Sequence, residues 1–115
     1  MAYITAYTLK THKPSSKSIS EILSQIQMSD YKEMLYAIDE HGQTSNSCTW
    51  YDHEDDLIKL SRLYPYVVFD LYGEGEESGD IWHKYFMNGK MQHCPAKITF
   101  DEFDVEMLRS PEEMI

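Results

Sequence analysis

The chain has 115 residues, of which 42% are hydrophobic and 13% aromatic, and this composition excludes an intrinsically disordered protein. It holds 20 acidic and 10 basic residues, a formal net charge of −10, which argues against direct binding to nucleic acid or to an anionic membrane. No run approaches the roughly 20 apolar residues of a membrane span, and Cys48 and Cys94 form no CxxC pair. We therefore expect a reduced, cytoplasmic protein, with a single disulfide as the alternative.

Alternation and capping residues define the elements of the first half. Residues 2–11 place Tyr, Thr and Leu on one face and Ile, Ala and Thr on the other, which predicts a strand, and Pro14 breaks the pattern. Ser18 and Glu21 then form an S-x-x-E capping box. Apolar residues with helical spacing follow, so we predict a short amphipathic helix that ends near residues 28–30.

The middle of the chain is interpreted as a hairpin and a helix. Residues 33–39 and 45–51 are interpreted as the two strands of the hairpin, with a turn around Gly42 between them. Residues 33–39 could instead extend a helix. Asp52 stands at the N-cap position of a helix over residues 53–63, which is acidic in its first turn and basic in its last, as the helix dipole favours.

The remaining strands follow Pro65. Residues 64–89 read as two strands of alternating pattern, joined by a turn rich in glycine and carboxylates. The dipeptide Asn88-Gly89 predicts a tight hairpin, after which residues 90–100 return as a further strand. Pro95 within this last segment indicates a sheet edge or a bulge.

The predicted order is β-α-β-β-α-β, followed by two further β segments. The first six elements match the ferredoxin-like pattern. We therefore predict an α+β fold, with two helices on one face of an antiparallel sheet that an extra C-terminal β-hairpin extends. Residues 1–100 are expected to form a single domain, and residues 101–115 an acidic C-terminal tail or short helix.

The negative charge is concentrated in the later part of the chain. Residues 51–115 hold six basic and fifteen acidic residues, whereas residues 1–50 are nearly balanced. One turn alone carries Glu74, Glu76, Glu77 and Asp80. It lacks the spacing of a calcium loop and the lysine of a phosphate-binding loop. The turn is thus either a solvated loop or a docking site for a basic partner.

Two aromatic residues beside this turn are candidate anchors for such a partner. Tyr72 precedes the turn and Trp82 follows it. Tyrosine and tryptophan dominate binding hot spots, although packing in the core is the more ordinary role of both.

Catalysis and metal binding have less support. Cys48 and His53 could act as a nucleophile and its base, but a cysteine next to Trp50 favours packing. His83 and His93 could meet across the hairpin and hold a ligand or a metal ion, and a pair of ordinary surface histidines is the simpler interpretation. We predict a protein that is not an enzyme and that has no cofactor.

Part of the chain, residues 50–90, resembles proteins encoded by mobile genetic elements. The run from Trp50 to Lys90, WYDHEDDLIKLSRLYPYVVFDLYGEGEESGDIWHKYFMNGK, resembles small proteins encoded by bacteriophages and plasmids, and looks most like a YubB-type ferredoxin-like domain. In that domain a tryptophan strand precedes a short helix, which ends in Leu-Ser and Tyr-Pro before a strand and an acidic turn. The resemblance implies a ferredoxin-like fold in a mobile element and assigns no catalytic residue.

Three hypotheses follow. The first is an acidic phage protein that docks on a basic host protein and inhibits it. A nucleic-acid-binding defence nuclease is the expected target, which would make the chain anti-CRISPR-like, because a compact anion can occupy a basic channel. The second is a regulatory or structural homodimer that pairs through a sheet edge, in place of a monomer. The third is a ligand-binding or metal-binding domain around His83 and His93.

Overall fold

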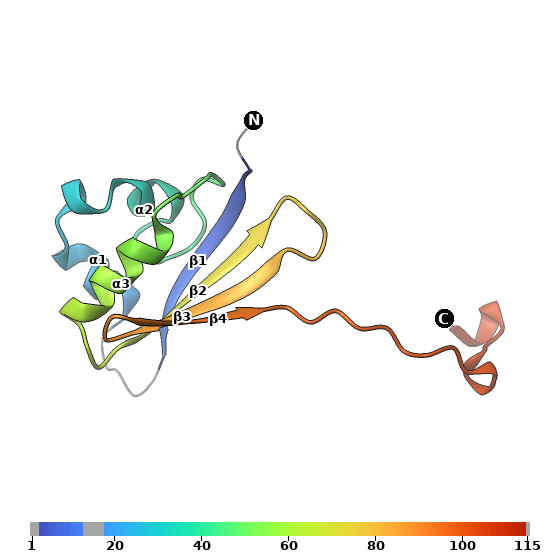
Figure 1. Cartoon of the computed structure of the whole chain (residues 1–115). Helices are drawn as coiled ribbons and strands as arrows, with labels where there is room; N and C mark the ends of the chain where they lie inside the picture. The colour runs from blue at the N-terminus through green and yellow to red at the C-terminus, as the bar shows by residue number, and fades with distance from the viewer. Residues whose placement is uncertain (1–2, 13–17, 115) are drawn as a thin grey trace.

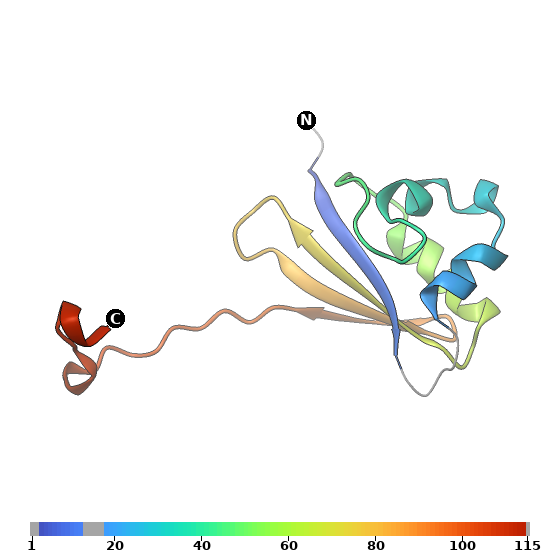
Figure 2. The ribbon, with the colours of Figure 1, turned by 180° about the vertical axis from the view of Figure 1, so that it is seen from behind.

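The computed structural model describes residues 3–12 and 18–114. Its centre is an antiparallel sheet whose four strands follow one another in space as in sequence: β1 (Thr5–His12), β2 (Val68–Gly75), β3 (Ile81–Met87) and β4 (Lys90–Pro95). Between β1 and β2 the chain forms α1 (Ile19–Gln25), the short 3-10 helix η1 (Met28–Asp30), α2 (Lys32–Ala37) and α3 (His53–Leu63). The helices lie on one face of the sheet (Figure 1), and the view from behind shows the same layering (Figure 2). The α+β class is therefore confirmed.

Strand alternation determines which side chains meet the helices. Leu9 of β1, Leu71 of β2 and Phe86 of β3 are fully buried and belong to one hydrophobic cluster with the helices. Residues one position away on these strands point to the other side, which we call the open face. The helices and the segment before α3 contribute large buried side chains to the cluster, among them Ile22, Met34, Trp50, Leu57 and Leu60.

Several local predictions are confirmed. Ser18 is the N-cap of α1, and its hydroxyl accepts a hydrogen bond from the Glu21 N–H at 3.2 Å. α1 ends at Gln25, earlier than predicted, and α3 has the predicted bounds. Asp52 occupies the N-cap position of α3 but makes no side-chain cap hydrogen bond. The predicted break at Pro14 lies outside the described residues.

The hairpin predicted over residues 33–39 and 45–51 is wrong. Residues 32–37 form α2, because Met34 and Ala37, three positions apart, are buried on one helix face. The return segment makes only isolated bridges in the described structure, from Thr44 to Ile38 and from Cys48 to Thr5. β1 pairs instead with β2, and the described strands do not follow the β-α-β-β-α-β order.

The β3–β4 hairpin has the predicted turn, and its second strand is shorter than expected. Asn88 and Gly89 have φ values of 49° and 76°, as the turn requires. β4 ends at Pro95 rather than at residue 100. The Ala96 N–H donates to the Ile81 carbonyl at 2.8 Å. The backbone nitrogen of Pro95, one residue earlier, therefore faces away from β3, where its lack of an N–H removes no hydrogen bond to β3. The predicted position of this proline at a sheet edge is confirmed.

Beyond β4 the chain leaves the sheet. Residues 96–104 form no regular element, and the 3-10 helices η2 (Val105–Met107) and η3 (Pro111–Met114) follow. Figure 1 shows this segment running away from the body of the molecule. We call residues 96–108 the C-terminal arm.

Candidate functional site

The acidic loop, which we define as residues 74–80, comprises the last two residues of β2 and the connection from β2 to β3. Backbone hydrogen bonds close it: the Gly75 N–H donates to the Asp80 carbonyl at 2.8 Å, and the Asp80 N–H to the Glu77 carbonyl at 3.1 Å. Gly79 adopts a φ of 84°, a conformation that other residues rarely accept. The four predicted carboxylates are therefore carried by a defined turn.

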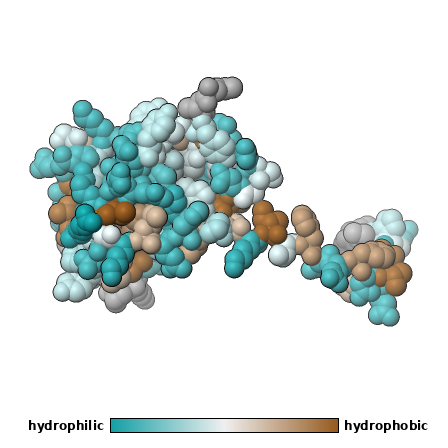
Figure 3. Space-filling model, in the orientation of Figure 1, coloured by the Kyte–Doolittle hydropathy of each residue, from teal (hydrophilic) through white to brown (hydrophobic). Residues whose placement is uncertain are grey.

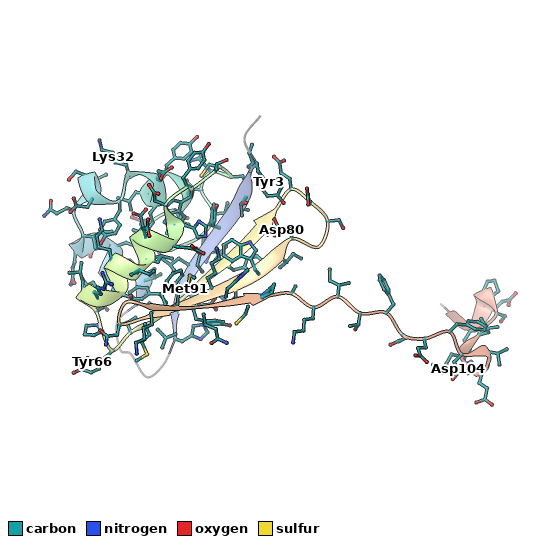
Figure 4. All side chains as sticks on the ribbon, in the orientation of Figure 1. Tyr3, Lys32, Tyr66, Asp80, Met91 and Asp104 are labelled. Carbon is teal, nitrogen blue, oxygen red and sulfur yellow. The ribbon has the colours of Figure 1, made fainter. Side chains whose placement is uncertain are left out.

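Tyr3 fastens this loop from the start of the chain. Its hydroxyl donates a hydrogen bond of 2.6 Å to Asp80 Oδ2 and accepts one of 3.0 Å from the Glu77 N–H. The bond to Asp80 raises the pKa of the Tyr3 hydroxyl, so the phenol remains the proton donor. Tyr3 and Asp80 lie at the same end of the sheet in Figure 4.

The charge of the loop is not neutralised by basic side chains. Glu74, Glu76 and Glu77 are exposed. Within the described part of the chain, no lysine or arginine nitrogen lies within 4.0 Å of their carboxylates or that of Asp80. The Tyr72 hydroxyl donates a long hydrogen bond of 3.5 Å to Glu74 Oε2. The loop therefore presents its carboxylates to solvent or to a partner.

The two predicted anchors lie on opposite faces of the sheet. Tyr72 pairs with His83 on the open face, whereas Trp82 pairs with Gly73 on the helix side. The Trp82 ring stacks on His53 at 5.5 Å between centroids, and a Cβ added to Gly73 would lie 2.1 Å from that ring. Trp82 thus packs against the core, and Tyr72 is the anchor that shares a surface with the loop.

The acidic first turn of α3 carries less available charge than its sequence suggests. Glu54 Oε2 lies 2.8 Å from Lys84 Nζ, and this hydrogen bond lowers the pKa of the Glu54 carboxyl. Asp56 Oδ2 accepts a hydrogen bond of 2.8 Å from Trp50 Nε1, and burial raises the pKa of Asp56. Both carboxylates therefore serve the fold.

A cluster around Asp70 was not predicted from the sequence. The Asp70 side chain points to the open face, yet the residue is only 2% exposed. Its Oδ2 lies 2.8 Å from His12 Nε2 and its Oδ1 lies 2.6 Å from His83 Nδ1. The His83 ring in turn stacks on Tyr85 at 5.8 Å between centroids. One carboxylate therefore orients two imidazoles beside a shallow hollow of about 320 Å³ lined by Thr8, Lys10, Tyr72 and His83.

A signal for this cluster was present in the sequence. Asp70 interrupts the apolar run of β2, and a charged group within a half-buried strand needs polar partners. Its partners are 58 and 13 residues away along the chain, so only the strand register identifies them.

A second polar cluster lies between α3 and β3. Lys84 is 8% exposed, and its Nζ lies 2.7 Å from His53 Nε2. Burial lowers the pKa of His53, and the charge of Lys84 lowers it further. His53 is therefore a neutral hydrogen-bond acceptor at neutral pH.

Burial raises the pKa of the Cys48 thiol, whereas a nucleophilic cysteine needs a lowered pKa.

The proposed histidine pair does not form. His83 pairs with Cys94 and His93 with Lys84, so the two histidines lie on opposite faces of the hairpin. Cys48 and Cys94 are free thiols. Across residues 3–12 and 18–114, no group of three or more His, Cys, Asp or Glu side chains is placed to hold a metal ion.

None of the described helices combines the length and the apolar character that a bilayer crossing requires. Comparison of the chain with protein-family models, with curated proteins and with solved structures finds no match.

Proposed function

We propose that this chain is a non-enzymatic binding protein that docks its acidic loop onto a basic surface of another protein. The observation that carries the proposal is the set of un-neutralised carboxylates on a loop that Tyr3 fastens. A pre-organised loop loses less conformational entropy on binding, and complementary charge accelerates encounter and selects the partner. Tyr72 adds an aromatic contact on the open face next to the loop.

A nucleic-acid-binding protein is the partner class that suits this surface. Such proteins expose lysine and arginine side chains that bind phosphate groups. A row of carboxylates carries the same negative charge as phosphate and can bind to the same side chains. Within this class we propose a bacterial defence nuclease, in keeping with the phage-encoded and plasmid-encoded proteins that residues 50–90 resemble. Binding there would inhibit the nuclease by occupying its channel, as an anti-CRISPR protein does.

The experiment is a capture from nuclease-treated bacterial lysate with three forms of the immobilised chain. The loop variant carries Glu74→Gln, Glu76→Gln and Glu77→Gln. The control variant carries Glu21→Gln, Asp30→Asn and Glu40→Gln, which removes the same charge from exposed positions outside the loop.

We expect wild type and control to retain the same nucleic-acid-binding protein. The loop variant should retain at least ~10-fold less, because three lost ion pairs of about 0.5 kcal/mol each correspond to that factor. Added double-stranded DNA or RNA should displace the captured protein. Equal losses in both variants would refute a specific role of the loop, and retention despite nucleic acid would refute occupancy of the channel.

A further inference from the structure

The chain exposes more surface than a folded monomer of its mass. Its accessible surface is 8248 Å² for 13.5 kDa, whereas the usual scaling gives about 6,500 Å². Its radius of gyration is 18.3 Å, against about 13 Å for a compact domain of this length. The excess of roughly 1,700 Å² is about twice what one partner buries in a standard protein interface.

The C-terminal arm accounts for the apolar part of this excess. Six of its large apolar side chains are more than half exposed: Ile98, Phe100, Phe103, Val105, Met107 and Leu108. Figure 3 shows hydrophobic residues along the arm outside the body of the molecule. Isolated exposed apolar residues are normal, but a series of this density marks an interaction surface. Carboxylates stand between them: Asp101, Glu102, Asp104 and Glu106.

A groove of matching chemistry lies at the other end of β4. This turn groove has a volume of about 540 Å³, and Pro65, Tyr66, Met87 and Met91 are among its lining residues. Its rim is basic. Lys90 lines it, and Arg62 lies against the turn, since a Cβ added to Gly89 would be 2.6 Å from Arg62 Nε. An apolar groove with a basic rim is complementary to an apolar segment that carries carboxylates.

The arm points away from the groove of its own chain. β4 starts at Lys90 beside the groove and ends at Pro95, where the arm begins. In Figure 4, Tyr66 and Met91 lie on the body and Asp104 lies far out on the arm. To fill its own groove, the arm would have to reverse and retrace the whole length of β4.

We propose that two copies of the chain pair antiparallel along their β4 edges and exchange their arms. Among the strands that the structure describes, β4 pairs with β3 alone, so its other edge is open to pairing. A two-fold axis near residues 96–97 places residues 100–106 of each copy along residues 87–93 of the other, in an isologous contact. Phe103 then reaches the partner's turn groove near Met91, and Asp104 and Glu106 reach its basic rim.

Sedimentation velocity of the full chain tests this arrangement. We expect a dimer at about 5 to 100 µM that persists in about 0.5 M NaCl, because its contacts are mainly apolar. The arm variant Phe100→Ser with Phe103→Ser should sediment as a monomer. The control, Met28→Ser with Tyr51→Ser, removes two apolar side chains of similar exposure from the helical layer and should remain a dimer. Circular dichroism should show the same folded secondary structure for all three, because the changed residues are exposed. The two dimers should melt at a somewhat higher temperature than the monomeric arm variant, because pairing stabilises only the folded chain.

A photo-crosslinking benzophenone side chain in place of Phe103 locates the arm. The expected product has twice the mass of one chain, with the crosslink between residue 103 and residues 65–92 of the other copy. A monomeric wild type, a dimer that survives in the arm variant, or a crosslink within one chain would each overturn the arm exchange. The loop variant tested above should stay dimeric, so failure of the proposed function and failure of the dimer are distinguishable.

Discussion

Ser61 joins the last turn of α3 to the β3–β4 hairpin through a single buried hydroxyl. Its Oγ donates to the Ile58 carbonyl and accepts from the Gly89 N–H, each at 2.8 Å. Ser61→Ala leaves that N–H without its partner, and we expect the free energy of unfolding in urea to fall by about 1–3 kcal/mol. Ser24→Ala, which removes an exposed hydroxyl bonded within α1, should change it by less than about 0.5 kcal/mol. Equal effects of the two substitutions would contradict this role of Ser61.

His53 makes stability depend on pH. Its pKa is lowered by burial and by Lys84, so on acidification the unfolded chain, with a histidine pKa of about 6.5, binds a proton before the folded chain does. The stability that depends on neutral His53 is fully present above about pH 6.5, and it is lost as pH falls through the lower pKa of His53 in the folded state.

His53→Gln keeps an acceptor for Lys84 and cannot titrate. Between about pH 7.5 and about pH 5.5, the unfolding free energy of wild type should therefore fall further than that of the variant. All other titratable groups are common to both proteins, so their contributions cancel in the difference. Identical pH profiles would show that His53 does not titrate in this range.

At the scale of elements, the acidic loop depends on the segment that precedes β1, through Tyr3. Tyr3→Phe removes the hydroxyl that bonds Asp80 and Glu77 without changing any charge. We expect faster amide hydrogen exchange at Glu77 and a loss of partner affinity of roughly 3-fold, smaller than that of the loop variant. Tyr51→Phe changes a tyrosine that is 75% exposed and should alter neither quantity. Unchanged exchange at Glu77 would show that Tyr3 does not hold the loop.

Elements with strong local signals were predictable, and those decided by tertiary contacts were not. α3 has its charged ends, and the β3–β4 hairpin has its Asn-Gly turn, so both were found from sequence. Residues 33–39 are short and apolar enough to suit a helix or a strand. Packing of α2 against α3 decides for the helix, and Tyr36, read as a strand residue, is exposed on it.

The candidate site was predictable only in part for the same reason. The acidic loop is local in sequence and was found as a cluster of carboxylates. The placement of Trp82 on the helix side and of Tyr72 on the open face depends on which face of the sheet the helices cover. The histidines that bind Asp70 depend on the strand register.

At the scale of the whole molecule, the two proposed surfaces are neighbours. Ala96, beside the proposed two-fold axis, bonds to Ile81 directly after the acidic loop, and Ile98 lies next to Gly79. An arm-exchanged dimer would therefore present two acidic loops close together. Two linked sites bind a dimeric or extended basic surface more tightly than either one alone. The arm variant should accordingly weaken partner binding as well, while keeping its dependence on salt.

The most direct test of the docking function is the salt dependence of affinity for the captured protein, measured by titration calorimetry for wild type and the loop variant. Between about 0.05 and 0.5 M NaCl, the affinity of wild type should fall steeply. The loop variant should bind more weakly at low salt and respond less to added salt. A wild-type affinity that stays constant over this range, or two parallel salt profiles, would contradict docking through the acidic loop.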